Sequence, residues 1–281
     1  SMMRDRLSIL LNLLAEDGVI FVHIDDNEQA YLKVMMDEIF GRRNYCGQIV
    51  WEKKKKPSFL NANMGTITEY ILCYAKERRK SPPFTYGLTT EGKKYPLNNA
   101  GNSIGILEFP AQSVRFRCKD QIFKPQDMSA GNIHTELLDK LEVKYGRNAN
   151  AFRLRGEWRY SQKKLDQIIF DKEDIVISKA PFRPNHIKAG GEDKKMKNLL
   201  SIAHYGMSTY EDATSESIQL FGKQSFDYPK PEKLIETIVG AVTERGDLVL
   251  DSFAGSGTTG AVAHKMGRRW IMVELGVHAK T

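Results

Sequence analysis

The sequence predicts an α/β protein with a doubly wound, Rossmann-like sheet that carries an inserted α+β domain. Residues 248–275 follow the order strand, glycine-rich loop, helix, strand, which is the unit of a doubly wound sheet. Residues 4–41 show helix, strand and helix patterns in turn. Glycine, proline and asparagine interrupt short segments from about residue 76 to 225. We therefore expect core residues 1–75 and 226–281 to flank a separate domain at 76–225.

The amino-terminal elements follow from the spacing of apolar residues. Residues 4–14 have helical spacing, and the unbroken apolar run Val19–Ile24 predicts a strand buried on both faces, as in a parallel sheet. Asp25 or Asp26 is expected to cap a helix at 27–40, with Glu28 or Gln29 reaching back and Gly41 ending it. Residues 46–53 and 68–77 predict two further strands.

The central region mixes aromatic and basic residues. One segment within it, residues 133–146, has the spacing of an amphipathic helix. Phe152 and Trp158 lie further along the central region, and these large aromatic residues are expected in the core rather than on a binding face. After this region, Pro231 suits the first turn of a helix that leads to the glycine-rich loop.

Composition narrows the classes of function. The net charge is +7, which favours a polyanionic partner, although a basic surface without that role is the alternative. No apolar run reaches the roughly 18 residues of a membrane helix, so no membrane association is expected. Cys46, Cys73 and Cys118 form no Cys-x-x-Cys pair. His23, at a strand end, is expected to be structural or to line a pocket, and the other five histidines show no metal-ligand spacing. A cytoplasmic protein without a structural metal is expected.

The loop from Asp251 to Thr259 is the strongest local signal. Its glycines allow close backbone approach to a ligand, and the following helix start favours an anionic group. Glu274, about twenty residues beyond Asp251, can accept both hydroxyls of a ribose. Gly-Lys-Ser/Thr is absent, which argues against a P-loop ATPase, and we interpret Gly255 and Gly257 as an incomplete dinucleotide fingerprint. Asp251 would repel a pyrophosphate but suits an amine or sulfonium.

These motifs resemble the β type of amino-group DNA methyltransferases. The segments "DSFAGSGTTGAVAHKMGRRWIMVEL" and "DYPKPEKLIETIV" are similar to their S-adenosylmethionine loop and preceding helix. "GEWRYS" and "HYGMSTYEDATSESIQLFG" resemble the modification subunits of type III restriction-modification systems. The resemblance implies an S-adenosylmethionine-dependent methyltransferase core in permuted order, catalytic half first, then a target-recognition domain, then the cofactor half. It implies cofactor contacts by Asp251, Phe253, Gly255, Ser256, Gly257, Thr258, Thr259, Glu274, Lys230, Pro231 and Leu234.

The catalytic motif of this family is absent from the expected place. Asp-Pro-Pro-Tyr or a close variant accepts the hydrogens of the target amine and stacks on the flipped base. Residues 81–84, Ser-Pro-Pro-Phe, fit a loose variant but follow a charged run rather than a buried strand, so we interpret them as a proline turn. The catalytic residues are therefore unknown, and we expect a fragment that lacks the catalytic segment and a carboxyl-terminal piece.

The resemblance implies transfer of methyl to adenine N6 in double-stranded DNA, with the chain inactive alone. A non-catalytic DNA-binding module, half of a split enzyme, and an RNA or small-molecule methyltransferase are the alternatives. A restriction subunit and a homodimer are partners that the resemblance allows. The expected DNA contacts are Lys53, Lys54, Lys55, Lys56, Arg115, Arg117, Arg153, Arg155 and Arg159, with Arg183 as a further candidate. A solvated face is the alternative for the lysine run.

Overall fold

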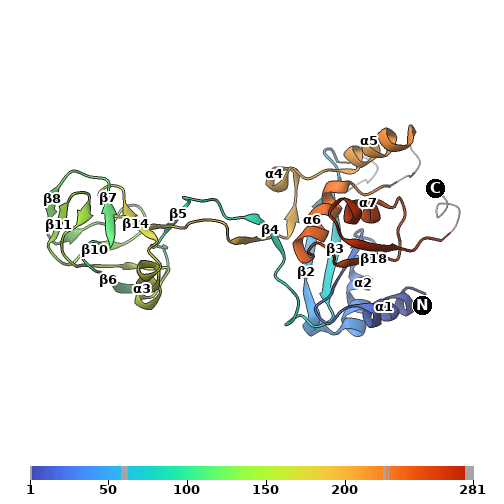
Figure 1. Ribbon diagram of the computed structural model, residues 1–281, viewed down its shortest axis with the longest axis horizontal. Coiled ribbons are helices and arrows are strands. Elements are labelled where there is room, and N and C mark those ends of the chain that lie inside the picture. Colours follow the sequence, from blue (N-terminus) through green and yellow to red (C-terminus); the bar gives the residue numbers. More distant parts are fainter. Residues whose placement is uncertain (1, 58–62, 224–225, 227, 276–281) are drawn as a thin grey trace. The chain divides into compact units, whose positions relative to one another are not determined.

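The computed structural model describes residues 2–57, 63–223, 226 and 228–275 (Figure 1). The described residues form two compact units, one from 1–86 and 194–281 and the other from 87–193. The inserted unit is therefore shorter than the change in sequence texture at 76–225 indicated. The difference arises because segments after residue 193 carry side chains, such as Leu200 and Met207, that are buried in the core of the first unit.

The first unit contains a four-stranded sheet in the order β1-β3-β2-β17. β3 pairs antiparallel with both β1 and β2, and β17 pairs parallel with β2. The elements of this part are α1 (Met2–Leu13), β1 (Val19–Ile24), α2 (Gln29–Met36), the π-helical turn η1 (Asp37–Gly41), the 3-10 turn η2 (Arg42–Asn44), β2 (Tyr45–Glu52), β3 (Thr68–Ala75), β17 (Leu199–Leu200), α4 (Ile202–Tyr205), α5 (Tyr210–Phe221) and α6 (Glu232–Val242).

Both faces of this sheet are covered, because successive side chains of β3 point to opposite faces. Ile71 and Cys73 belong to a cluster with Leu234 and Ile238 of α6. On the other face, Leu72 and Tyr74 pack with a second set, Leu7, Leu32, Met36 and Phe40, from α1, α2 and η1. The result is a layered α/β core of the kind that the sequence predicts.

A second, two-stranded sheet carries the glycine-rich loop. β18 (Leu248–Asp251) and β19 (Arg269–Met272) pair in parallel, and α7 (Thr258–Lys265) connects them. This is the strand–loop–helix–strand unit expected from the sequence, and the α/β, Rossmann-like fold class is confirmed. Apolar side chains of this sheet remain partly open to solvent: Leu248, Leu250, Trp270 and Ile271.

Two details of the first unit differ from expectation. Val19–Ile24 is a strand, but it pairs only antiparallel with β3 among the described residues, and its side chains are half-buried. The expectation of parallel pairing is therefore wrong, because an apolar run does not specify the partner strand. Both faces of the strand are nevertheless packed, since Phe21 lies against the cluster of Ile71 and Cys73, and Ile20 and Val22 lie against that of Leu72 and Tyr74. The cap of α2 also differs: Glu28 occupies that position without a side-chain hydrogen bond, while Asp25 accepts from the backbone N–H of Asn27.

The second unit is mainly β. One sheet has the order β6-β13-β10-β9 and the other β5-β15-β14-β7-β12-β11-β8. Its elements are β5 (Lys94–Pro96), β6 (Ile104–Phe109), β7 (Val114–Phe116), β8 (Gln121–Phe123), β9 (Gln126–Asp127), β10 (Thr135–Leu137), β11 (Leu141–Lys144), β12 (Arg147–Asn148), β13 (Phe152–Glu157), α3 (Gln162–Phe170), β14 (Asp174–Ile177) and β15 (Asn185–Ile187). The remaining pair, β4 (Thr85–Leu88) and β16 (Asp193–Lys195), lies where the chain passes between the units.

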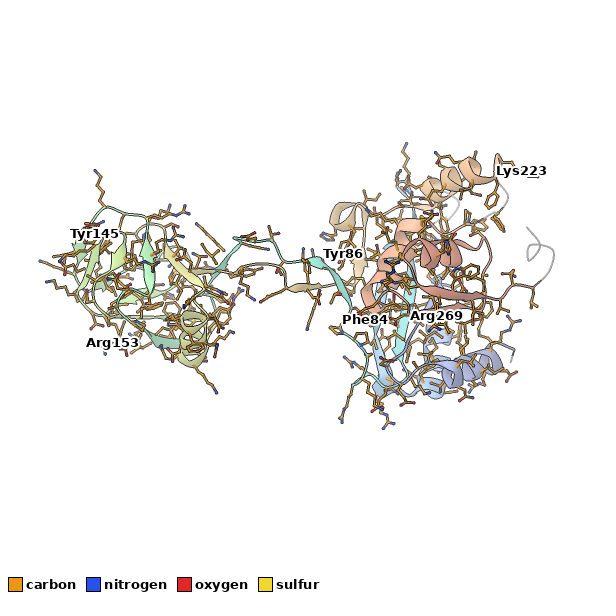
Figure 2. All side chains as sticks on the ribbon, in the orientation of Figure 1. Phe84, Tyr86, Tyr145, Arg153, Lys223 and Arg269 are labelled. Carbon is orange, nitrogen blue, oxygen red and sulfur yellow. The ribbon has the colours of Figure 1, made fainter. Side chains whose placement is uncertain are left out.

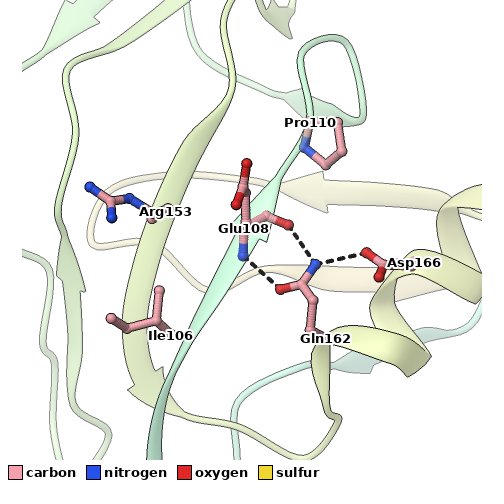
Figure 3. Close-up of a pocket in the computed structure, with 6 residues that line it drawn as sticks. All are labelled: Ile106, Glu108, Pro110, Arg153, Gln162 and Asp166. Atoms are coloured by element: carbon pink, nitrogen blue, oxygen red, sulfur yellow. Dashed lines mark hydrogen bonds between the residues drawn. The ribbon is translucent and has the colours of Figure 1, made fainter.

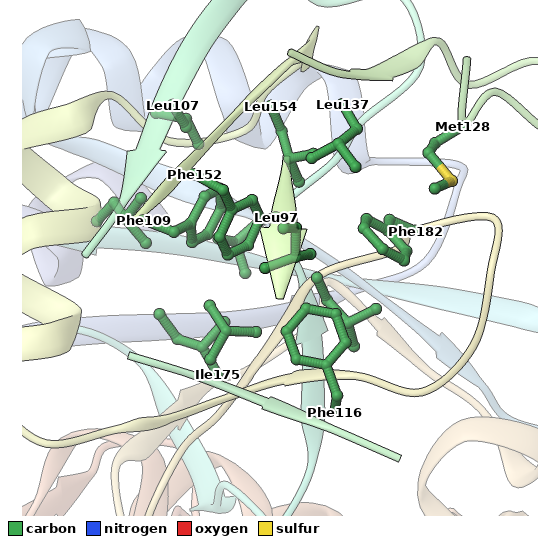
Figure 4. Packing of buried hydrophobic residues seen from close by; sticks show 14 of the residues in the cluster. Leu97, Leu107, Phe109, Phe116, Met128, Leu137, Phe152, Leu154, Ile175 and Phe182 are labelled. Atoms are coloured by element: carbon green, nitrogen blue, oxygen red, sulfur yellow. The ribbon is translucent and has the colours of Figure 1, made fainter. Parts of the chain in front are cut away.

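One aromatic core holds the second unit together (Figure 4). The rings of Phe109 and Phe152 stack with centroids 5.1 Å apart, and Phe116 meets Phe182 edge to face. Trp158 is also buried, and its indole N–H donates to the carbonyl of Gly105 at 3.0 Å. The prediction that Phe152 and Trp158 belong to the core is confirmed.

The helix expected at 133–146 is wrong, because this segment forms β10 and β11. The side chains of Thr135 and Leu137 are buried on either side of an exposed Glu136, and Leu141 and Val143 repeat the pattern. Their backbone groups pair with β13 and with β8. The strand period of two therefore prevails over a helical spacing that the same apolar residues also satisfy.

Candidate functional site

The glycine-rich loop between β18 and α7 is compact and internally bonded. Gly255 and Gly257 have positive φ angles of 51° and 78°, which side chains other than glycine adopt at a cost. The backbone N–H of Ala254 donates to the carbonyl of Val273, which follows β19. Among the described residues, the backbone N–H groups of Thr258 and Thr259 in the first turn of α7 have no acceptor. This end of the helix can therefore donate to a ligand.

Two carboxylates hold the loop from opposite sides. Asp251 accepts from the backbone N–H of Phe253 at 2.9 Å and from the hydroxyl of Thr259 at 2.6 Å. Glu274 accepts from the backbone N–H of Gly255 at 2.6 Å. Ser256 and Thr258 share a hydroxyl contact of 2.9 Å. Glu274 also accepts from the backbone N–H of Leu275 at 2.8 Å. The residues that the sequence predicts around the loop are thus brought together at two carboxylates.

Gly260 is a functional residue that the reading of the loop missed. A Cβ at this position would lie 3.0 Å from Cγ of Met272 and 3.4 Å from the ring of Trp270, so glycine lets α7 pack closely on β19. Close helix–strand packing is the role of the third glycine in Gly-x-Gly-x-x-Gly. Gly255, Gly257 and Gly260 have that spacing, so the interpretation of an incomplete fingerprint is wrong, and the spacing itself was the available signal.

Phe253 lies at the outer side of the loop with 47% of its surface exposed. The guanidinium of Arg6, on α1, lies over its ring at 5.0 Å from the centroid. The loop therefore presents, within one unit, an aromatic face, hydroxyls, backbone donors and two carboxylates. This combination fits a nucleoside that carries a charged tail better than a bare phosphate.

The remaining residues predicted for the same pocket have other surroundings. Pro231 caps the start of α6 and is buried, and Leu234 has no exposed surface because it lies in the core beside the sheet. Lys230 points its ammonium group at Glu69 and Tyr210. Pro231 and Leu234 therefore support the structure behind a site, whereas Lys230 belongs to a separate polar cluster.

We call this set of His23, Lys53, Glu69, Tyr210 and Lys230 the Glu69 cluster. The carboxylate of Glu69 lies 2.7 Å from Nε2 of His23, 3.0 Å from Nζ of Lys53 and 2.9 Å from the hydroxyl of Tyr210. The ammonium of Lys230 lies 3.5 Å from it. Five segments distant in the sequence are thus joined at one carboxylate that has 11% of its side chain exposed.

Burial and charge shift the titration of this cluster. Burial lowers the pKa of His23, although its hydrogen bond to Glu69 opposes the shift. Burial alone would raise the pKa of Glu69, but the hydrogen bond with His23 and the charge of Lys230 hold that pKa far below its ordinary value. Burial also lowers the pKa of Lys230. With His23 neutral and both lysines charged, the cluster carries one net positive charge.

These shifts predict that the first unit loses stability in acid in two steps. The pKa of His23 is below its ordinary value of 6.5, so the unfolded chain binds the extra proton and stability falls as the pH drops below 6.5. The pKa of Glu69 is below its ordinary value of 4.5, so its contribution is lost at still lower pH, together with that of other carboxylates. Melting temperatures measured from pH 8 to 4 test this. His23→Gln should remove the first step and retain the second; a wild-type melting temperature that stays constant from pH 7 to 5 contradicts the prediction.

The structure separates the four consecutive lysines. Lys53 is held in the Glu69 cluster, and Lys55 pairs with Asp212 at 2.8 Å. Lys54 and Lys56 instead line a hollow of about 360 Å³. The other residues of this hollow are Pro57, Tyr210, Glu211, Thr214 and Tyr228. Lysines beside tyrosine rings suit a phosphate-bearing, aromatic ligand such as a nucleic acid.

Most of the arginines predicted to contact DNA have acidic partners in the second unit. Arg153 forms two hydrogen bonds of 2.9 Å with Asp139, Arg115 pairs with Asp174, and Arg155 lies 3.6 Å from Glu136. Arg159 reaches Asn99 at 3.5 Å. Arg183 donates to the hydroxyl of Thr135 and to nearby backbone carbonyls, which is a structural role. Of the predicted arginines, Arg117 has an exposed side chain without a partner among the described residues.

A second hollow, of about 410 Å³, lies on the second unit beside Arg153 (Figure 3). The side-chain amide of Gln162 bonds both backbone groups of Glu108 and also Asp166, which covers the open edge of β6. The charged residues that line this hollow are Glu108, Asp166 and Arg153, and Arg153 is already paired with Asp139. Because two carboxylates outnumber the one arginine, this hollow is a poor site for an anionic ligand. The hollow lies where Gln162 hydrogen-bonds to the backbone of the edge strand β6, which gives these residues a structural role.

Two other sequence interpretations concern residues outside the loop. A turn at 78–80 ends at Ser81, whose backbone N–H donates to the carbonyl of Glu77, and residues 82–84 form an irregular link into β4. Phe84 packs on Phe21 with ring centroids 5.4 Å apart. The turn thus precedes the two prolines, and a proline turn remains a prediction. Within the described part of the chain, no cluster of three or more His, Cys, Asp or Glu side chains could hold a metal ion. No helix of that part is long and apolar enough to cross a membrane.

A parallel strand–loop–helix–strand unit, with Asp251 as the last residue of β18 and Glu274 shortly after β19, is typical of α/β proteins that bind nucleosides. Comparison with known proteins makes the class more specific. The model of the N6/N4-methyltransferase family, described as DNA methylase, matches residues 1–280, and the chain belongs to this family.

Three relatives illustrate the similarity. The chain is 30% identical over 263 residues to the Mod subunit of the type III restriction-modification enzyme StyLTI of Salmonella typhimurium, covering 92% of this chain and 37% of the relative. It is 31% identical over 277 residues to the EcoPI Mod subunit of Escherichia phage P1, covering 92% and 42%. It is 27% identical over 290 residues to the type II methyltransferase M.EcaI of Enterobacter cloacae, covering 99% and 54%. The chain thus spans between about a third and a half of the length of these relatives.

Proposed function

We propose that this chain carries the cofactor-binding and DNA-recognition parts of a DNA methyltransferase that modifies adenine N6 in a restriction-modification system. The observation that carries the proposal is the loop from Asp251 to Thr259, closed by Glu274, in a member of the DNA methylase family. Two relatives that match most of the chain are type III Mod subunits, which supports the restriction-modification role.

The residues of the loop fit S-adenosylmethionine. The carboxylate of Glu274 would accept the ribose hydroxyls, and Asp251 would face the charged methionine end, where an anionic side chain favours an ammonium or sulfonium group. Phe253, Ser256, Thr258 and the backbone of Gly257 would line the pocket. The cofactor supplies an activated methyl group, and the protein residues hold and orient it.

Duplex DNA is the partner that the charge favours. The chain carries a net charge of +7, and Lys54, Lys56 and Arg117 are charged side chains without an ion pair among the described residues. Unit 87–193 would then recognise the target sequence. A restriction subunit, a second copy of the chain and a location in the cytoplasm belong to the same proposal, because the type III relatives are subunits of restriction-modification enzymes.

A specific observation also supports the second candidate, half of a split enzyme. Among the described residues, β1 pairs only with β3 and β18 only with β19, so each strand has one edge without a partner. Leu248 and Leu250 of β18 are partly exposed. Open edges and exposed apolar groups favour pairing with a further strand. We propose that a polypeptide segment with the Asp-Pro-Pro-Tyr motif adds that strand, and that this chain alone does not transfer methyl.

Three measurements test the proposed function. Calorimetry with S-adenosylmethionine and S-adenosylhomocysteine should show weak binding, because we propose that the segment with the Asp-Pro-Pro-Tyr motif completes the pocket. Anisotropy with a labelled duplex should show binding that weakens steeply with salt.

Tritiated methyl transfer should be at background for the chain alone and rise when a polypeptide with the catalytic segment of a relative is added. A folded chain that binds neither cofactor excludes the proposed site, and transfer by the chain alone excludes the split form.

A further inference from the structure

The hairpin that joins β11 to β12 has an unusual residue at its tip. Lys144 and Arg147 are paired across the hairpin, so Tyr145 and Gly146 form a two-residue turn. Both have positive φ, 51° for Tyr145 and 71° for Gly146, as in a type I′ turn. Asn, Asp or Gly normally occupies the first position, because their side chains tolerate this backbone conformation best. A tyrosine there strains the fold locally, and residues kept under strain are often functional.

The frame beneath this tip is rigid. Asn148 is fully buried: its side-chain carbonyl accepts from the backbone N–H of Val114 at 2.8 Å, and its amide donates to the carbonyl of Pro110. Leu141 and Val143 of β11 are buried in the core of the unit. The backbone N–H of Phe116 also donates to the carbonyl of Gly146 at 2.8 Å. The turn is therefore held in position from two sides, so Tyr145 is presented in a defined place.

The ring of Tyr145 makes no contact that would explain its presence. It is 96% exposed, and among the described residues no aromatic ring or cation packs on it (Figure 2). Burial in the core and local packing are thereby both excluded as reasons for the strain. An aromatic surface of this kind is available to a partner outside the chain.

The surroundings of the tip are mainly cationic. Lys144 and Arg147 flank the turn. Arg117 follows Phe116, whose backbone N–H donates to the carbonyl of Gly146 in the turn. The ammonium of Lys144 lies 2.9 Å from the carboxylate of Glu142. Glu142 raises the pKa of Lys144, and the negative charge of Asp120 contributes in the same direction. Arg147 donates to the carbonyl of Gln112, and its guanidinium has no carboxylate partner among the described residues. An exposed aromatic ring among cations suits a nucleic acid, in which phosphates adjoin flat bases.

We propose that Tyr145 inserts at a base step of the bound duplex and stacks on a nucleobase that this insertion unstacks, and that the hairpin tip from Lys144 to Arg147 is a DNA-probing element of unit 87–193. This inference rests on the proposed function, because it takes duplex DNA as the partner. The flanking cations hold the backbone, and the ring supplies contact with a base. The strain at Tyr145 is the cost of placing an aromatic ring at the most projecting position of the hairpin.

Four variants test the role of the ring, with affinity for a labelled duplex measured by fluorescence anisotropy at several salt concentrations. Tyr145→Ala and Tyr145→Asn should weaken binding roughly 5- to 100-fold, the range for loss of one base stack. The dependence of affinity on salt should not change, since no charge is lost. Tyr145→Phe should bind like wild type. Phe170→Ala is the matched control, because Phe170 is 80% exposed in the same unit; it should stay within about twofold.

Folding provides a second, independent measurement. Asn suits the first position of a type I′ turn better than Tyr, so Tyr145→Asn should raise the melting temperature by about 2–6 °C while it weakens DNA binding. Equal DNA affinity of Tyr145→Ala and wild type overturns the inference alone, as does a loss in Tyr145→Phe as large as in Tyr145→Ala. A folded wild-type chain that binds no duplex overturns both this inference and the DNA partner of the proposed function.

Discussion

Glu69→Gln is expected to lower the free energy of unfolding by about 3 kcal/mol, a large loss for the substitution of one polar side chain. The side chains of Lys53 and Lys230 are only 15% and 28% exposed, and both lie beside this carboxylate. Without its charge, two cations would remain close together in a poorly solvated site. Removing one member of a buried ion pair is costly for this reason, whereas the intact pair contributes little by itself.

Urea denaturation followed by tryptophan fluorescence measures this loss, and hydrogen exchange of the β3 amides assigns it to the unit that contains Glu69. Glu38→Gln is the matched control, because Glu38 pairs with Arg4 and both side chains are about half exposed, at 54% and 46%. Its effect should stay within about 0.5 kcal/mol. Adding Lys230→Met to Glu69→Gln should recover part of the stability. Equal effects of the two glutamine variants would show that the cluster is as well solvated as the surface.

The second large effect concerns the cofactor loop. Glu274→Ala is expected to weaken binding of S-adenosylmethionine and S-adenosylhomocysteine about 10- to 150-fold, because the loss of one hydrogen bond between a ribose hydroxyl and this charged group costs about 1.5–3 kcal/mol. It also removes the acceptor for the backbone N–H of Gly255, which helps to hold the loop.

Calorimetry with both ligands measures this effect, and Glu244→Ala serves as control because Glu244 is an exposed glutamate of the same unit. Glu274→Gln retains one carbonyl acceptor and should show an intermediate loss. Circular dichroism must show that the variants are folded. If Glu274→Ala binds both ligands as tightly as wild type, then Glu274 does not hold the ribose, and the ligand site lies elsewhere.

The prediction from sequence was best where a pattern is local. The glycines, the hydroxyl residues and Asp251 lie within ten residues of one another, so strand, loop and helix could be placed before any tertiary contact was known. The family resemblance rests on this stretch together with the segments 156–161, 204–222 and 227–239, and the family match bears it out. Gly260 completes the Gly-x-Gly-x-x-Gly spacing inside α7, where the glycine serves helix–strand packing rather than the turn itself.

Prediction was poorest where long-range partners decide the outcome. Residues 133–146 satisfy a helical spacing, yet β8 and β13 supply partners that make them strands. Arginines that suggested DNA contacts, such as Arg115 and Arg153, meet Asp174 and Asp139 from distant segments. No spacing in the sequence indicates such pairs, because they depend on which strands become neighbours.

By itself, the sequence determined the class of ligand site, because a glycine-rich turn between strand and helix is specified by residues adjacent in the chain. Only the tertiary structure decided which charged groups are taken up in ion pairs and which remain available to bind an anionic partner. It joined His23, Lys53, Tyr210 and Lys230 at Glu69, and left Lys54, Lys56 and Arg117 without ion pairs among the described residues. It also revealed the strained turn at Tyr145, since a positive φ becomes visible only when the pairing of Lys144 with Arg147 sets the length of the turn. Local backbone preferences act over a few residues, whereas burial and charge pairing depend on segments that only folding brings together.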